Sequence, residues 1–210
     1  MKSDLSLHKV NQLKPFISRT LTSWTRPSDW LALPTVSEGE ERIVILYAVF
    51  ESENNLCAFS ITGNFTVDWG DGSALENFSA DVTAYHTYSY STISDATISS
   101  QGYKQAVISI TPQIGAHLTA VNLGRALSTA GGVSGQSSSY LEIKLAGSLI
   151  STLTLSGTTK ATKLTSLSFM GTNSITSFNN MFSGCYSLQS IPLLNTALGT
   201  NFSYMFAGCS

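Results

Sequence analysis

A 24-residue period runs through the C-terminal two-fifths of the chain, and this period restricts the folds that the chain can adopt. The segment 164–169, LTSLSF, recurs at 188–193 as LQSIPL, and the segment 180–185, NMFSGC, recurs at 204–209 as YMFAGC. A fixed period of this length is typical of one supersecondary unit per repeat, with the units stacked into a solenoid. Such units bury their apolar faces only against their neighbours. We therefore predict stacked coils with a continuous apolar column, whose members are Met181, Phe182, Cys185, Met205, Phe206 and Cys209.

Weaker copies of the same apolar pattern lie upstream, at 118–123 and 140–145. The first positions of the four segments, 118, 140, 164 and 188, are almost evenly spaced, so the two weaker copies continue the repeat upstream. The segment 150–155 also fits the pattern but breaks the spacing, so the register in this region stays open. The glycine- and serine-rich stretch 128–139 predicts a loop between coils. We thus predict a solenoid over residues 114–210.

Charged residues are scarce, at 11% of the chain against about 25% in ordinary globular proteins. None lies between residues 164 and 210, and Glu142 is the only acid beyond Asp95. A net charge of −2 without clustered basic residues gives no reason to expect nucleic-acid binding. No apolar run reaches about 18 residues, so we expect no membrane insertion, and the N-terminus has no apolar segment typical of a secretory signal.

Residues 36–113 have the pattern of a β-sandwich, which makes the expected fold class mainly β. Short runs of β-branched and aromatic residues alternate with turn signals, and Gly70-Asp71-Gly72-Ser73 is the strongest of these turns. The predicted strands lie at 42–50, 57–61, 65–69, 83–88 and 106–111.

Two segments of this region resemble the PKD family of immunoglobulin-like sandwiches. They are Val67-Asp68-Trp69-Gly70-Asp71-Gly72-Ser73 and His86-Thr87-Tyr88, followed by a strand that ends at Pro112. The chain has one residue fewer before its Gly-Asp-Gly than the commonest form of the motif. The resemblance implies that Trp69 is a core residue, that Gly70, Asp71 and Gly72 form a turn, and that His86 and Tyr88 lie on a strand nearby. PKD domains are mostly spacers and interaction modules, so it implies no active site.

The repeat Met-Phe-x-Gly-Cys, followed by an apolar segment such as 188–193, resembles the leucine-rich repeats of bacterial surface antigens of the BspA type. These repeats also occur in tail and fibre proteins of bacteriophages. A leucine-rich-repeat-like coil that ended at Ser210 would expose its apolar face. We therefore expect the natural polypeptide to continue beyond this residue, or a partner to cover this end.

Residues 1–35 form an irregular N-terminal arm, in which three prolines interrupt any long helix. Two alternatives account for its tryptophans. They either fold back onto the following domain, or they dock into a partner, because Trp and Arg are favoured anchors at interfaces. The candidate partner-binding residues are Phe16, Trp24, Arg26 and Trp30.

No arrangement of residues points to catalysis. The acids around the Gly-Asp-Gly turn could bind Ca²⁺, but we favour Asp71 as a cap that accepts hydrogen bonds from its own turn. Cys57, Cys185 and Cys209 lack the spacing of a zinc site, although a disulfide between the last two stays open. The scarcity of acids beyond Glu142 argues against glycoside hydrolysis within the repeats, because that reaction needs two carboxylates. We expect no cofactor, no metal and no enzyme.

The combination of arm, PKD-like sandwich and BspA-type repeats resembles a virion structural protein of a tailed bacteriophage, of the tail, neck or fibre type. The resemblance implies a protein assembled in the host cytoplasm that binds portal, neck or tail proteins through its arm. It also implies contacts with copies of itself, and with a host-surface glycan or protein. The alternatives are a bacterial surface adhesin or matrix protein of the same modular type, and a polysaccharide-degrading spike.

Overall fold

The computed structural model describes residues 24–128, 134–136, 139–155 and 161–209. Within these residues the chain is mainly β, as predicted, and its one helical element is a short 3₁₀ turn at Asp95–Thr97. No described helix is long and apolar enough to cross a membrane. The strands are β1 (Arg42–Val49), β2 (Leu56–Thr62), β3 (Phe65–Asp68), β4 (Glu76–Phe78), β5 (Thr83–Thr87), β6 (Lys104–Pro112), β7 (Ala120–Asn122), β8 (Ala126–Ser128), β9 (Ser134–Gln136), β10 (Tyr140–Ala146), β11 (Thr152–Thr154), β12 (Ser166–Met170) and β13 (Ser190–Leu193).

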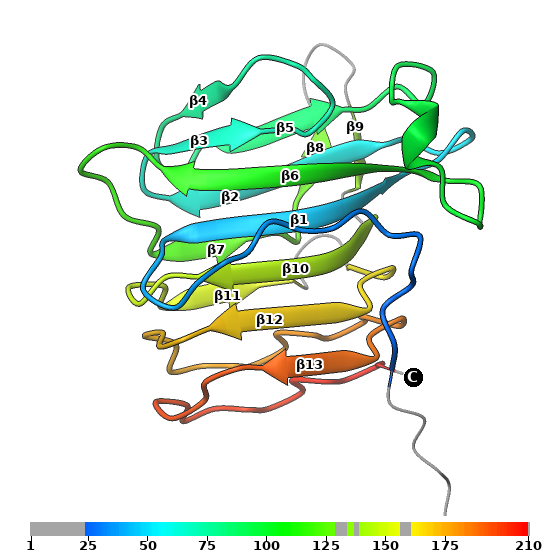
Figure 1. Ribbon diagram of the computed structural model, residues 1–210. Helices are drawn as coiled ribbons and strands as arrows, with labels where there is room; N and C mark the ends of the chain where they lie inside the picture. The colour runs from blue at the N-terminus through cyan, green and yellow to red at the C-terminus, as the bar shows by residue number, and fades with distance from the viewer. Residues whose placement is uncertain (1–23, 129–133, 137–138, 156–160, 210) are drawn as a thin grey trace, which may run out of the picture.

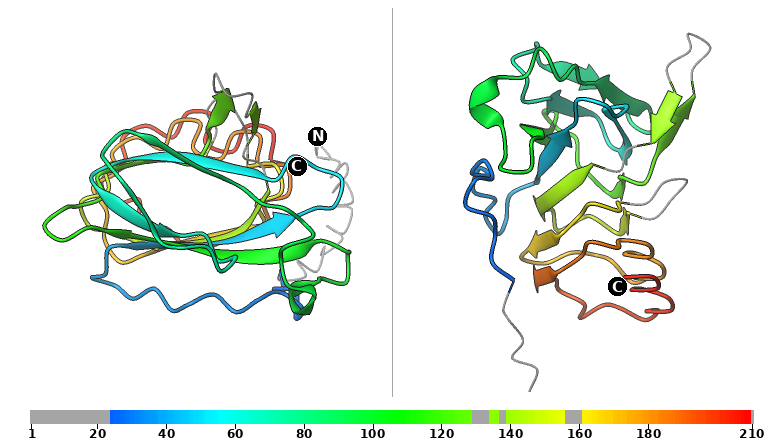
Figure 2. Two further views of the ribbon diagram at one scale, coloured as in Figure 1. Left: turned by 90° about the horizontal axis from the view of Figure 1, so that it is seen from above. Right: turned by 90° about the vertical axis from the view of Figure 1, so that its right-hand side faces the viewer.

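Two mixed sheets face each other. The larger has seven strands in the order β13-β12-β10-β1-β6-β3-β4, which run from bottom to top in Figure 1. The smaller has four strands in the order β11-β7-β2-β5. Seen from above, the two layers enclose an elongated interior (Figure 2), and β8 and β9 form a separate antiparallel pair.

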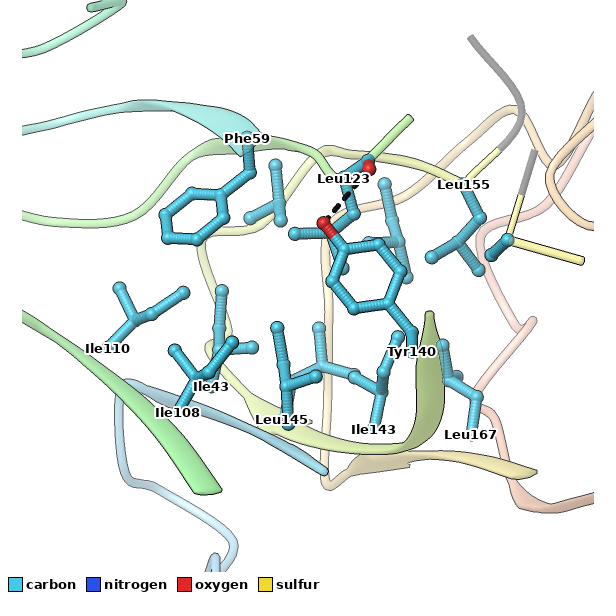
Figure 3. Packing of buried hydrophobic residues seen from close by; sticks show 14 of the residues in the cluster. Ile43, Phe59, Ile108, Ile110, Leu123, Tyr140, Ile143, Leu145, Leu155 and Leu167 are labelled. Carbon is cyan, nitrogen blue, oxygen red and sulfur yellow. Dashed lines mark hydrogen bonds between the residues drawn. The ribbon is translucent and has the colours of Figure 1, made fainter. Parts of the chain in front are cut away.

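The interior is filled by one apolar cluster that reaches from the antiparallel strands to the last repeat. Ile43 of β1, Phe59 of β2 and Met205 of the last repeat all belong to it. Tyr140 of β10 extends across this core, and its hydroxyl lies 3.2 Å from the carbonyl oxygen of Leu123 on the opposite layer (Figure 3). The buried phenol therefore has a polar partner, as burial of a hydroxyl requires.

Strand β1 is apolar on both faces, because both faces are covered. Its odd-numbered residues from Ile43 to Val49 point into the core between the sheets. Its even-numbered residues, Val44, Leu46 and Ala48, pack on the outer side against residues of the segment 24–36. This segment, which we call the strap, runs along the outer face of the seven-stranded sheet (Figure 2, right). An unbroken apolar run in an antiparallel strand is thus explained by a third layer.

The 24-residue period appears as parallel, stacked segments. Strands β10, β12 and β13 are parallel, and Glu142 pairs with Ser166, which pairs with Ser190. On the opposite side of the coils, Ser177 pairs with Asn201 in the same direction. One period of the sequence therefore separates hydrogen-bonded parallel neighbours, and we call each such 24-residue segment a coil.

The predicted register is wrong upstream of residue 140. The segment 118–123 is not the coil before 140–145: its strand β7 lies in the smaller sheet and pairs in parallel with β11, in the segment 150–155 that broke the spacing. The apolar pattern reports which residues of a strand are buried, and it is the same in either sheet. The stretch 128–139 also differs from the predicted loop, because Ser128 and the residues 134–136 belong to the β8–β9 pair.

The remaining predicted strands of the sandwich all correspond to observed ones, but the short strand β4 was not predicted from the sequence. The seven-stranded sheet continues across residue 113, where we placed the boundary between sandwich and repeats, because β10 pairs with β1. An extra residue at Leu141 forms a bulge in this pairing. The antiparallel strands and the parallel strands β10, β12 and β13 thus belong to one continuous sheet.

Candidate functional site

Three groups of sequence-predicted residues can be located in the structure, and the first is the Gly-Asp-Gly turn. Trp69 is fully buried, and the ring of His86 from β5 stacks on it with 5.1 Å between ring centroids. The hydroxyl of Tyr88 donates a hydrogen bond of 2.7 Å to the carbonyl oxygen of Trp69. The residues that the family resemblance placed together therefore do lie together, as a packed structural cluster.

Asp71 connects this turn to the neighbouring strand. Its Oδ1 accepts a hydrogen bond of 3.0 Å from the backbone N–H of Ser73, and its Oδ2 lies 2.7 Å from Nε2 of His86. Burial alone would raise the pKa of Asp71, but the hydrogen bonds from Ser73 and the contact with His86 together lower it. Burial raises the pKa of Tyr88 well above its ordinary value. Asp71 thus caps its own turn, and the geometry is that of a fixed loop.

The strap is the second group, and its central contact is an ion pair. Nε of Arg26 lies 2.6 Å from Oε2 of Glu142, whose side chain is only 6% exposed. The guanidinium also donates hydrogen bonds to the carbonyl oxygens of Trp30 and Leu31. It therefore links the backbone of the strap to Glu142 of the sheet. Lys144 lies 3.6 Å from the other carboxylate oxygen. Such a charge-assisted network is geometrically specific.

Trp30 is buried against the sheet rather than exposed. Its indole N–H donates a hydrogen bond of 2.7 Å to the hydroxyl of Tyr103. Buried Gln105 of β6 accepts from the backbone N–H of Leu31 and donates to the carbonyl oxygen of Asp29. A surface groove of about 350 Å³ lies beside this contact. Its lining includes Trp24, Phe50, Leu141, Lys163 and Ser187.

The structure therefore places Arg26 and Trp30 as the fold-back alternative expects, and Trp24 packs against Trp30 with 6.4 Å between ring centroids. Phe16 lies outside the described residues, and partner binding by the arm stays a prediction. Sequence reasoning missed Glu142 and Gln105 as the polar anchors of the strap. The signal for Glu142 was its isolation as the only acid beyond Asp95, because a single acid needs a partner when it is buried.

The repeat column is the third group. Phe182 is fully buried and stacks on Phe206, with 5.4 Å between centroids and 3° between ring planes. Met181, Cys185 and Met205 are also buried. Phe206 contradicts the expected dry column, because it is 49% exposed. Its position in the last coil explains this exposure, since no described coil follows it.

Cys185 and Cys209 are both thiols, so no disulfide joins them. Burial raises the pKa of the Cys185 thiol to about 12. Burial also raises the pKa of Cys209, whose thiol lies 3.1 Å from the carbonyl oxygen of Phe182. Both side chains therefore behave as small apolar groups within the column.

In the part of the chain that the structure describes, no three His, Cys, Asp or Glu side chains are grouped so that they could hold a metal ion. Comparisons with family models, with curated proteins and with solved structures gave no match for the chain.

Proposed function

We propose that the chain is a non-enzymatic virion structural protein of a tailed bacteriophage, of the tail, neck or fibre type. In this proposal residues 36–113 are a PKD-like sandwich that acts as a spacer. Residues 114–210 are a leucine-rich-repeat-like solenoid, with its coils beginning at β10. The observation that carries the proposal is the stack of parallel strands β10, β12 and β13, which is built directly onto an antiparallel double layer and carries no charged residue from position 164 onward. Such a stack gives a rigid extended surface rather than an enclosed site.

In this proposal the strap and the residues before it have different roles. Residues 24–36 cover the outer face of β1 and are held by Arg26 and Gln105. We assign attachment to other virion proteins to the residues before Trp24, including Phe16. Contact with the host surface or with sister subunits falls to the coils and to the groove beside Trp24 and Phe50.

Mass spectrometry of purified particles tests the proposal, because it predicts that the chain is a stoichiometric virion component. Deletion of residues 1–23 should abolish incorporation while the purified protein keeps its unfolding transition. Deletion of residues 1–35 is the contrasting variant, since it also removes the strap and should destabilise the fold. Normal incorporation of the shorter deletion would contradict the assignment of the arm.

The same material separates the alternatives. Recovery of the chain from a secreted or cell-surface fraction, and not from particles, would favour a bacterial adhesin. Release of reducing sugar from host polysaccharide by the purified protein would favour a degrading spike.

A further inference from the structure

The groove beside the strap is lined by aromatic side chains from three separate parts of the chain. Trp24 and Trp30 belong to the strap, Phe50 follows β1, and Tyr103 precedes β6. Trp30 and Tyr103 are buried and joined by a hydrogen bond, so they form the floor, whereas Trp24 and Phe50 are partly exposed. The volume of about 350 Å³ is in the range of sites for small ligands. The groove therefore offers an aromatic surface to a ligand.

Another part of the lining follows the stack of coils. Leu141 and Thr165 are one 24-residue period apart, and so are Lys163 and Ser187. These residues lie at or just before the starts of β10, β12 and β13, and the strap passes this end of the strands at the right of Figure 1. Neighbouring strands are about 4.8 Å apart, so the lining extends over about 10 Å along the stack. An elongated ligand fits such a groove better than a compact one.

The groove also offers hydrogen-bond donors and acceptors without a net charge. Lys163 is the only charged residue of the described lining, and its Nζ lies 2.7 Å from Oε2 of Glu53. Within the described part of the chain, the indole N–H of Trp24 and the side chains of Gln101 and Ser187 have no hydrogen-bond partner. The amide and the hydroxyl can each donate and accept. A ligand of this groove thus needs apolar faces with uncharged polar groups around them.

We propose that this groove binds an uncharged saccharide chain of the host surface. A sugar ring has C–H bonds on its two faces and hydroxyl groups around its edge. The C–H hydrogens carry a partial positive charge and pack on the negative face of an aromatic ring, which Trp24 and Phe50 supply. The hydroxyls both donate and accept, as Gln101 and Ser187 require. This inference names the ligand class of the groove to which the proposed function assigns host contact, and it rests on that function for the source of the saccharide.

Other classes of ligand fit the groove less well. A cation would be repelled by the ammonium of Lys163, which already lies 4.4 Å from the centre of the Phe50 ring. A nucleic acid needs several basic side chains along its phosphates, and the described lining has one. A hydrocarbon chain would leave the amide of Gln101 without a partner. A proline-rich peptide also packs on aromatic grooves, but proline has no N–H to donate to the acceptors.

The test probes the full chain on an array of bacterial surface oligosaccharides, and then measures the dissociation constant of the best-bound uncharged one by titration calorimetry. Trp24→Ala should raise this constant at least about ten-fold, because it removes a ring from the lining. Gln101→Ala changes an exposed side chain that no packing depends on, and should raise it about three-fold or more. Tyr85→Ala is the matched control, since it removes a ring that is 41% exposed on β5 of the smaller sheet, and should leave the constant unchanged.

Several results would overturn the proposal: binding of no uncharged oligosaccharide, binding that neither Trp24→Ala nor Gln101→Ala weakens, or tighter binding of a proline-rich peptide that Trp24→Ala abolishes. Deletion of residues 1–23 keeps every lining residue and should leave the dissociation constant unchanged. Tighter binding after this deletion would also overturn the proposal, because the groove would then belong to the chain's own N-terminal segment. Absence of the protein from particles would end the proposed virion role without changing these affinities, so the two failures are distinguishable.

Discussion

The ion pair between Arg26 and Glu142 gives the sharpest test of whether the strap is part of the folded unit. Removing one partner of a buried pair costs about 3–5 kcal/mol, because the remaining charge is left uncompensated. Here Lys144 lies 3.6 Å from the carboxylate and Arg26 is 29% exposed, so part of that cost is avoided. We expect Arg26→Met to lower the free energy of unfolding by about 2–3 kcal/mol. That is a large fraction of the ~5–15 kcal/mol typical of a domain.

Urea unfolding followed by tryptophan fluorescence and by far-UV circular dichroism measures this loss, and a double-mutant cycle assigns it. The double variant Arg26→Met/Glu142→Leu should be more stable than the sum of the single losses implies, since no buried charge is left unpaired. Glu53→Gln breaks the exposed pair with Lys163 and serves as the control, with an expected loss below about 1 kcal/mol. If Arg26→Met stays within about 0.5 kcal/mol of wild type, the range of ordinary surface substitutions, the strap is not a stabilising part of the folded unit.

Three further substitutions or reactions probe the turn and the column. Gly70→Ala should destabilise far more than Gly72→Ala in the same unfolding assay: both glycines have positive φ, but a Cβ at Gly70 would lie 2.2 Å from a carbonyl oxygen of β6, while the space at Gly72 is open. Because folding lowers the pKa of Asp71, its contribution is complete above the ordinary value of 3.8 and is lost as the pH falls through the lower folded value. The stability difference between wild type and Asp71→Asn, measured from pH 2 to 6, should therefore shrink towards acid. Iodoacetamide at pH 8 should modify Cys209 well before Cys185, whose pKa is about 12, as peptide mass spectrometry would show; equal labelling would contradict the burial of the column.

All the strands of the sandwich except β4 could be predicted, because each of them is apolar on at least one face and bounded by a turn signal. Strand β4 has no buried residue and gave no such pattern. The strap could not be assigned from the same evidence. The unbroken apolar run from Ile43 to Val49 was used only to predict a strand. Such a run is also typical of a strand covered on both faces, but it does not say which segment covers the second face. That choice depends on Glu142 and Gln105, which are distant from Arg26 and Leu31 in sequence and hydrogen-bonded to them in space.

In the repeats, the spacing of the sequence predicted the strand pairing downstream of residue 140 but not upstream of it. The 24-residue step from Leu164 to Leu188 was visible because identical contacts recur, and it sets the pairing of β12 with β13. The step from 118 to 140 was wrong because two sheets are interleaved in this region. Segments with a similar apolar pattern then alternate between the two sheets. Strand β7 therefore pairs with β11, although β10 lies between them in sequence, because β10 belongs to the other sheet. Spacing predicts stacking only where one coil is complete between successive copies.

The absence of charge in the repeats follows from the same stacking. A residue at any position of the coil lies beside its equivalent in the next coil, so a repeated charge would face a like charge at close range. Uncharged polar side chains avoid this conflict and add hydrogen bonds between coils. The amide of Asn179 donates to the carbonyl oxygen of Ser203 at 3.1 Å, and the hydroxyl of Thr200 donates to that of Thr176 at 3.0 Å. The serine, threonine and asparagine side chains that take the place of charged residues in the repeats therefore help to hold successive coils in register.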